Sequence, residues 1–189
     1  FGCDHRGVFA TTYLELSREL RRSFAGDPEL FEDLEYLYTQ DALFADFYFD
    51  EVIDWERGRE VAPAWRIAFQ QAESGRITAA QEMLLGINAH VQNDMPFVIA
   101  AMGVRRPGGA SRKPDHDAVN EVLNRAYESV VREVGARYDS SMSLTNSELT
   151  IADDVGGLEM ARSWRELVWR NAERLLLARS EAERALGVA

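Results

Sequence analysis

Apolar side chains return at helical spacing along nearly all of this chain, and no segment alternates apolar and polar residues as a strand does. In the segment 4–24, large apolar residues recur every three or four positions, which places them on one helix face. Comparable stripes occupy the segments 29–55, 64–73, 78–102, 115–138 and 158–186. Because such helices bury their apolar faces against one another, the pattern predicts an all-α fold: a single-domain bundle of about six helices over residues 1–189.

Local signals mark several helix ends. Thr78 followed by Gln81 has the pattern of a capping box, which begins a helix. Asp115 is placed to cap the helix that follows the basic loop 105–114. Pro96 lies inside the segment 78–102, and proline divides or kinks a helix because it lacks an N–H and its ring clashes with the preceding turn.

The charge balance narrows the choice of partners. The chain has 32 acidic residues against 21 lysines and arginines, a net charge of −11. A negative field repels phosphate backbones and anionic lipid, so we expect neither nucleic acid nor a membrane surface as partner. No apolar run reaches the roughly 18 residues of a membrane span. We expect a small molecule as the partner.

Cysteine usage bears on the cellular compartment. Cys3 is the only cysteine, so the chain cannot form an intramolecular disulfide, which suits a reducing compartment. The sequence shows no signal-peptide pattern. We therefore expect a cytoplasmic protein, and the sequence leaves open whether it forms a homodimer.

The run GINAHVQND at 86–94 places ionisable side chains inside an otherwise apolar helix. His90 and Asp94 are four residues apart and share one helix face. Buried ionisable groups are paired, bind a metal or have shifted pKa values. We therefore interpret His90 and Asp94 as a candidate catalytic acid–base pair; the alternative is a polar pair that only fixes how the helices pack.

A pocket beside this pair needs a second wall, and the aromatic segment 29–55 is the best candidate. Large aromatic side chains beside a few polar groups are the usual lining of a small-molecule site. We expect the pocket between residues 44–55 of this segment and the helix around residues 86–97. The candidate substrate-binding residues are Gly86, Asn93, Phe97, Tyr48 and Trp55.

A metal site is a further alternative. Asp46, Asp50 and Asp54 recur every four residues, a spacing typical of a solvated helix face and also able to present metal ligands. In the metal interpretation, Asp50 joins His90 and Asp94 around a single divalent ion; otherwise the protein needs no cofactor. His116, flanked by Asp115 and Asp117, leaves open whether a second histidine shares the site.

These observations give three functional hypotheses. The first is a small-molecule enzyme that uses His90 as base or acid, with Asp94 orienting it. The second is a metal-dependent hydrolase with mixed histidine and carboxylate ligands. The third is a non-catalytic helical binding protein. The chain has no HExxH, CxxC, phosphate-binding loop or nucleophile-elbow motif that would favour a known mechanism.

The run LLGINAHVQNDMP at 84–96 resembles the LLGxNAHIxxDL helix of a bacterial, all-helical domain family of unknown function. The runs PAWRIAF at 63–69 and DHDAVNEVL at 115–123 resemble segments that flank this helix in the same family. The resemblance covers most of the chain. It implies a helical domain built around a GINAH(I/V)xxD core helix, and it implies no particular activity.

The His–Asp spacing is also similar to that of zinc-dependent phospholipase C and single-strand nuclease bundles, which bind metal through such a pair on a core helix. Those bundles use many histidines and an amino-terminal tryptophan as ligands, whereas this chain has three histidines and begins with Phe1. This more distant resemblance therefore implies at most one metal ion, held by histidine and carboxylate together.

Overall fold

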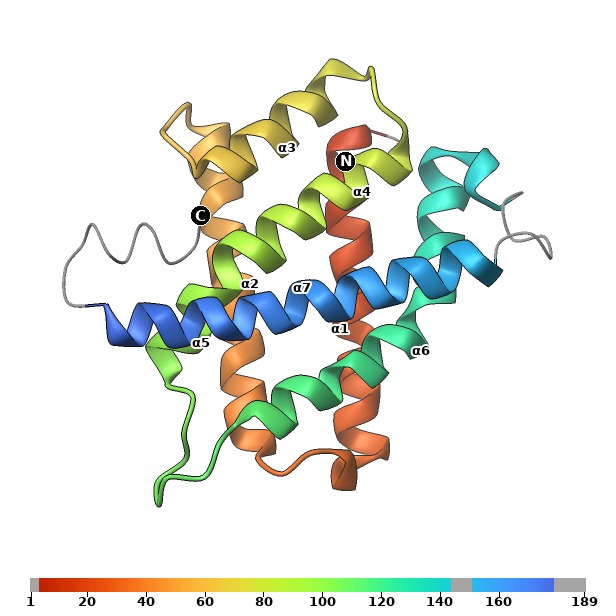
Figure 1. Cartoon of the computed structure of the whole chain (residues 1–189). Coiled ribbons are helices and arrows are strands. Elements are labelled where there is room, and N and C mark those ends of the chain that lie inside the picture. Colours follow the sequence, from red (N-terminus) through yellow and green to blue (C-terminus); the bar gives the residue numbers. More distant parts are fainter. Residues whose placement is uncertain (1–3, 144–150, 179–189) are drawn as a thin grey trace.

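The computed structural model describes residues 4–143 and 151–178, and within them every regular element is helical (Figure 1). The α-helices of this part of the chain are α1 (Val8–Gly26), α2 (Leu34–Glu56), α3 (Pro63–Ser74), α4 (Ala79–Asn88), α5 (Met95–Met102), α6 (Lys113–Tyr138) and α7 (Ile151–Leu177). The all-α bundle predicted from the sequence is confirmed. Since α4 and α5 are halves of one interrupted helix, the expected number of about six is also close.

The bundle is built from two extensive helix pairs. α1 packs along α6, and α5 packs along α7. In Figure 1, α7 crosses in front of α1, while α4 runs obliquely between α3 and α7. The interior of this arrangement is apolar, with side chains such as Trp65, Ile99 and Val168 fully buried. No helix in the described ranges has the length and apolar character needed to cross a membrane.

The predicted interruption of the central helix is present. The Thr78 side chain accepts a hydrogen bond from the Gln81 backbone N–H and completes the capping box that begins α4. Between α4 and α5 lies a six-residue π-helical segment, Ala89–Asp94, and Pro96 occupies the first turn of α5. A proline is tolerated in a first turn because the N–H it lacks would have no intrahelical partner there.

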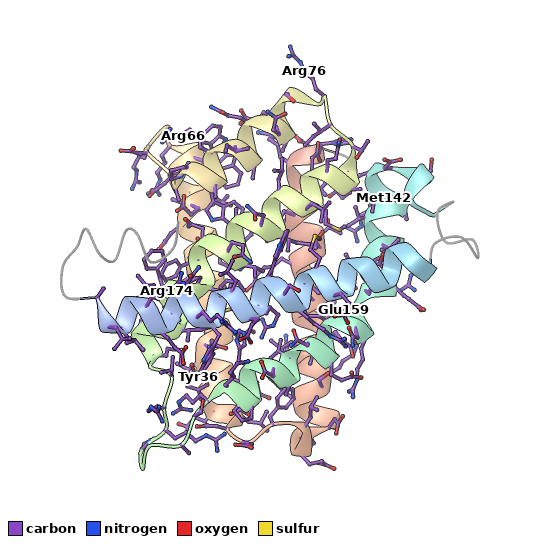
Figure 2. The ribbon with its side chains drawn as sticks, in the orientation of Figure 1. Tyr36, Arg66, Arg76, Met142, Glu159 and Arg174 are labelled. Carbon is purple, nitrogen blue, oxygen red and sulfur yellow. The ribbon has the colours of Figure 1, made fainter. Side chains whose placement is uncertain are left out.

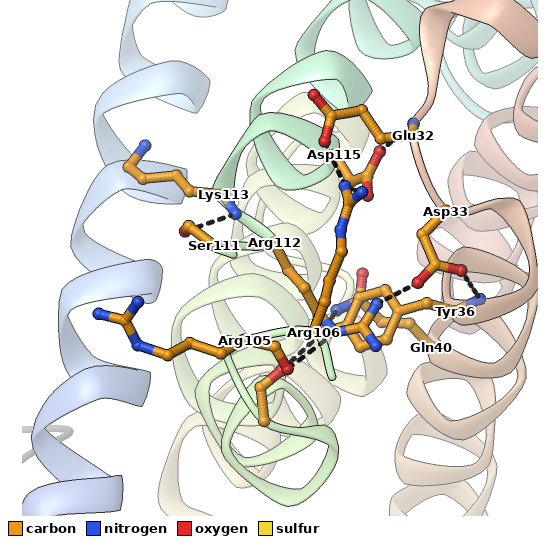
Figure 3. Close-up of polar contacts among 11 residues, drawn as sticks. Glu32, Asp33, Tyr36, Gln40, Arg105, Arg106, Ser111, Arg112, Lys113 and Asp115 are labelled. Atoms are coloured by element: carbon orange, nitrogen blue, oxygen red, sulfur yellow. Dashed lines mark hydrogen bonds and ion pairs between the residues drawn. The ribbon is translucent and has the colours of Figure 1, made fainter. Parts of the chain in front are cut away.

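Two helix starts differ from the prediction. α6 begins at Lys113, so Asp115 lies within its first turn and does not cap it. The buried Asp115 carboxylate instead accepts hydrogen bonds from the Glu32 backbone N–H at 2.6 Å and from the Arg106 guanidinium at 3.0 Å (Figure 3). α7 begins at Ile151, before the expected start at residue 158. The predicted end of that helix and Cys3 lie outside the described residues.

Ion pairs hold the basic loop between α5 and α6 against α2 (Figure 3). Arg112 donates to the Asp33 carboxylate at 2.5 Å, and its guanidinium lies 3.9 Å from the centre of the Tyr36 ring. Arg106 pairs with Glu32 and Asp115. The loop therefore closes the end of the bundle where α6 begins. Arg76, between α3 and α4, instead extends away from the edge of the bundle into solvent (Figure 2).

Candidate functional site

The π-helical segment Ala89–Asp94 carries both residues of the predicted pair. π-helical turns within α-helices are rare and occur frequently at functional sites. The side chains of His90 and Asp94 are both buried, with 2% and 1% of their surface exposed. His90 Nδ1 lies 2.9 Å from Asp94 Oδ2. The two side chains thus form the direct contact that their sequence spacing predicted.

The hydrogen bonds around Asp94 fix the tautomer of His90. Asp94 Oδ2 also accepts the indole N–H of Trp65 at 2.9 Å, and Oδ1 accepts the amide N–H of Asn93 at 2.7 Å. Three donors around one carboxyl group suit the ionised, acceptor-only form. His90 Nδ1 therefore carries the proton and donates it to Asp94, which leaves Nε2 of the neutral ring as an acceptor.

Aromatic rings enclose His90. Phe44 of α2 stacks on the imidazole with ring centres 3.5 Å apart, and Tyr13 of α1 meets it edge-on at 4.9 Å. Phe9, Tyr48 and Trp65 complete the enclosure at 5.7 to 5.9 Å. Burial among these rings lowers the pKa of His90, against the smaller opposing effect of Asp94. The ring is therefore neutral at pH 7, as a general base must be before it accepts a proton.

His90 Nε2 is buried and has no hydrogen-bond partner within the described residues. A cavity of about 400 Å³ lies beside it, between α1, α2, α4, α6 and α7. His90 lines this cavity and Asp94 does not. The Nδ1 edge of the ring faces Asp94. The volume falls within the range of small-molecule sites.

Most of the cavity lining is apolar. The polar or ionisable lining side chains are Thr12, Tyr13, Ser17, Gln40, Asp41, His90, Tyr127, Trp164 and Arg165. Two lining residues, Leu84 and Met160, are exposed by 41% and 37%. The cavity therefore reaches the surface beside α4 and the first half of α7.

The candidate substrate-binding residues lie mostly around the pair and outside this cavity. Tyr48 packs within the rings that enclose His90, and Trp55 follows Tyr48 by about two helical turns. Both side chains line a small second pocket of about 30 Å³. Asn93 is held by Asp94. Phe97 is 39% exposed and does not line the cavity. The helix around 86–97 does supply one wall, but α2 contributes through its first half, around Gln40 and Phe44.

Gly86 admits a neighbouring side chain. A Cβ at this position would lie 2.4 Å from a ring carbon of Phe9, closer than real contacts allow. The absence of a side chain at Gly86 therefore lets α1 approach α4 and brings Phe9 to the His90 ring. The space at Gly86, which was predicted to contact the substrate, is thus occupied by a side chain of the protein itself.

The row of carboxylates on α2 does not reach His90. Asp46 and Asp50 are exposed, and Asp54 pairs with Arg59 at 2.9 Å. Because His90 and Asp94 are buried, the exposed Asp50 side chain does not join them. In the described ranges, no three histidine, cysteine, aspartate or glutamate side chains are clustered as metal ligands. The row has the arrangement of a solvated helix face.

The structure adds one residue that the sequence analysis missed, Arg165 of α7. Its side chain lines the cavity with only 5% of its surface exposed. It donates to the backbone carbonyl and to Nδ1 of His116, and the His116 Nε2–H donates to the Arg165 carbonyl at 3.0 Å. His116 therefore acts as the partner of Arg165 and makes no contact with His90. Arg165 precedes the buried Val168 by three residues and Ala172 by seven, the spacing that could have revealed its burial.

These features define an all-helical bundle with a buried His–Asp pair beside an apolar cavity. The chain belongs to a family of unknown function, DUF5995, whose model matches residues 2–188. No curated protein and no solved structure matches the chain significantly. The family resemblance read from the sequence is thus confirmed, and the more distant similarity to phospholipase C bundles stays untested.

Proposed function

We propose that this protein is a small-molecule enzyme that binds its substrate in the cavity and uses His90 as general base. The observation that carries the proposal is at His90: its side chain lines the cavity, and its Nε2 is buried without a hydrogen-bond partner among the described residues. A buried polar atom without a partner is costly, so such an atom in a folded protein asks for an explanation. A substrate hydroxyl, amide or acidic C–H facing Nε2 would supply one.

The surrounding residues support this role. Asp94 accepts the Nδ1 proton and so keeps the lone pair on Nε2. When Nε2 takes a proton from a substrate, the ionised Asp94 would stabilise the imidazolium that forms. Trp65 and Asn93 hold the carboxylate in place through its other lone pairs. The stacked Phe44 ring fixes the plane of the imidazole.

The variant His90→Asn tests the proposal. The asparagine amide can still donate to Asp94 from near the position of Nδ1, but it places no base where Nε2 was. His5→Asn is the matched control, because His5 contacts Glu82 and lies outside the cavity lining. Each protein is incubated with a small-molecule extract, and the change in each compound is measured by mass spectrometry.

We expect wild type and His5→Asn to deplete the same compound, with depletion by His90→Asn slower by at least about 100-fold, the usual contribution of a general base. Equal depletion by all three proteins would remove His90 from the chemistry. A compound that all three bind and return unchanged would identify a non-catalytic binding protein instead.

A further inference from the structure

Arg165 is a buried cation that has no carboxylate partner among the described residues. Its side chain is 95% buried, and its hydrogen-bond acceptors within the described residues are the carbonyl oxygen and Nδ1 of His116. Its Nε has no partner there. Asp117 raises the pKa of Arg165 electrostatically but forms its ion pair with Lys113. The guanidinium thus lacks the anion that a buried arginine ordinarily contacts.

Burial does not remove the charge. It lowers the pKa of Arg165 to about 10, so the side chain stays protonated at neutral pH. Keeping an unpaired charge out of water costs several kcal/mol. A buried, unpaired guanidinium at a cavity wall is therefore best explained by an anion that binds in the cavity.

His116 fixes the guanidinium in one orientation. The histidine Nε2–H donates to the Arg165 carbonyl, so Nδ1 is the unprotonated nitrogen that accepts from Arg165. Burial, together with the nearby guanidinium, keeps the pKa of His116 well below its usual value, so the ring stays neutral and accepts this hydrogen bond. The cation is thus held in place before any ligand binds, which reduces the entropy lost on binding.

The rest of the cavity sets the other properties of the ligand. The cavity walls are mainly aliphatic and aromatic side chains, so a ligand that fits them has an apolar body. Among the described residues, Arg165 is the only arginine or lysine in the lining, so one negative charge suffices. Burial raises the pKa of Tyr13, and Asp41, the one acid that the described residues bring to the lining, raises it further and so lies near Tyr13. Repulsion by Asp41 would direct an anionic group away from that side.

We propose that the cavity binds an amphipathic monocarboxylate, with its carboxylate paired to Arg165 and its largely apolar body, which would carry the group that His90 deprotonates, extending toward His90. Guanidinium and carboxylate match in planar geometry and can form two parallel hydrogen bonds. This inference rests on the proposed function, because it names the substrate class of the same cavity. It also stands by itself as a statement about binding.

The first test uses the wild-type protein and varies only the head group of the ligand. Isothermal titration calorimetry compares dodecanoate, dodecanol and dodecylamine below their micellar concentrations. We expect dodecanoate to bind at least about tenfold more tightly than dodecanol, which corresponds to about 1.4 kcal/mol, with dodecylamine the weakest. Equal affinity for the acid and the alcohol, tighter binding of the amine, or no binding of dodecanoate would overturn the proposal.

The second test replaces the cation. Arg165→Met should lower the affinity for dodecanoate to that for dodecanol and leave the affinity for dodecanol unchanged. Arg162→Met is the matched control, because Arg162 is exposed on the same helix and pairs with Glu159. Loss of dodecanoate affinity in both variants, or in neither, would contradict the assigned role. If Arg165→Met does not fold, the head-group series on wild type still decides the question.

The binding test separates this inference from the proposed function. His90→Asn should keep the preference for dodecanoate over dodecanol, since Arg165 is unchanged in this variant. Head-group preference without any turnover would leave the anion site standing and end the catalytic proposal. Turnover that depends on His90, together with equal binding of charged and uncharged ligands, would leave the catalytic proposal standing and end the proposal of an anion site.

Discussion

The indole N–H of Trp65 donates to Asp94 at 2.9 Å, on the same carboxylate oxygen that accepts the His90 proton. Trp65 comes from α3 and is fully buried. This contact ties the π-helical segment to a helix that precedes it in the chain. The orientation of the candidate base therefore depends on the packing of α3 as well as on local spacing.

Replacing Asp94 should shift the titration of His90. Burial lowers the His90 pKa and Asp94 raises it, so Asp94→Asn leaves burial unopposed and should lower the pKa further. The measurement is an NMR titration of the histidine ring signals. Asp50→Asn, which removes an exposed carboxylate, serves as the control and should leave the His90 titration as in wild type. A His90 pKa that is equal in all three proteins would show that the pair is not electrostatically coupled.

Gly86→Ala should destabilise the fold through Phe9. Helix propensity alone favours alanine by about 1 kcal/mol, whereas overpacking of a core contact costs about 1 to 3 kcal/mol. The new Cβ would lie 2.4 Å from a Phe9 ring carbon, so overpacking should prevail and reduce the free energy of unfolding by up to about 2 kcal/mol. In the control Gly26→Ala, the new Cβ meets nothing within 4 Å. Urea denaturation gives the free energy of unfolding of each variant. Equal values for Gly86→Ala and Gly26→Ala would show that Phe9 moves aside without cost.

Arg165→Met should leave the folded protein as stable as wild type or more stable. The substitution loses hydrogen bonds from a charged donor, worth about 1.5 to 3 kcal/mol, and removes a burial cost of several kcal/mol. Urea denaturation at neutral pH gives the comparison, with the exposed Arg162→Met expected to change stability by less than about 0.5 kcal/mol. A decrease of more than about 3 kcal/mol in the free energy of unfolding of Arg165→Met would mean that Arg165 stabilises the fold.

Stability should fall as the solution is acidified below pH 6.5, in part because of His116. Its folded-state pKa lies well below the usual 6.5. Between the two values the unfolded chain binds a proton that the folded chain excludes, so this histidine's contribution is complete above pH 6.5 and declines as the pH falls. His116→Gln retains a donor for the Arg165 carbonyl and removes the titration. In this pH window, we expect the free energy of unfolding of the variant to fall by about 1.4 kcal/mol less per pH unit than that of wild type. Parallel stability curves would contradict a neutral, buried His116.

Local sequence determined the helices and the His90–Asp94 contact. Apolar periodicity, the Thr78 cap and Pro96 depend on interactions within a few residues, so the α4 start and the interruption before α5 could be predicted. The buried pair could be predicted for the same reason, since four residues bring side chains together in almost any helical geometry. α7 was less well predicted: it begins at Ile151, before the expected residue 158. Its buried face includes Arg165, whereas Leu167 and Leu176 are exposed.

Tertiary structure alone decided where the cavity lies and what lines it. α7 crosses α1 and helps to form a cavity that Trp55 and Phe97 do not line, and Arg165 of α7 is buried against His116. Phe9, and no ligand, fills the space at Gly86. These outcomes depend on the way helices far apart in sequence cross, and apolar periodicity specifies which face of a helix is buried without specifying which helix covers it.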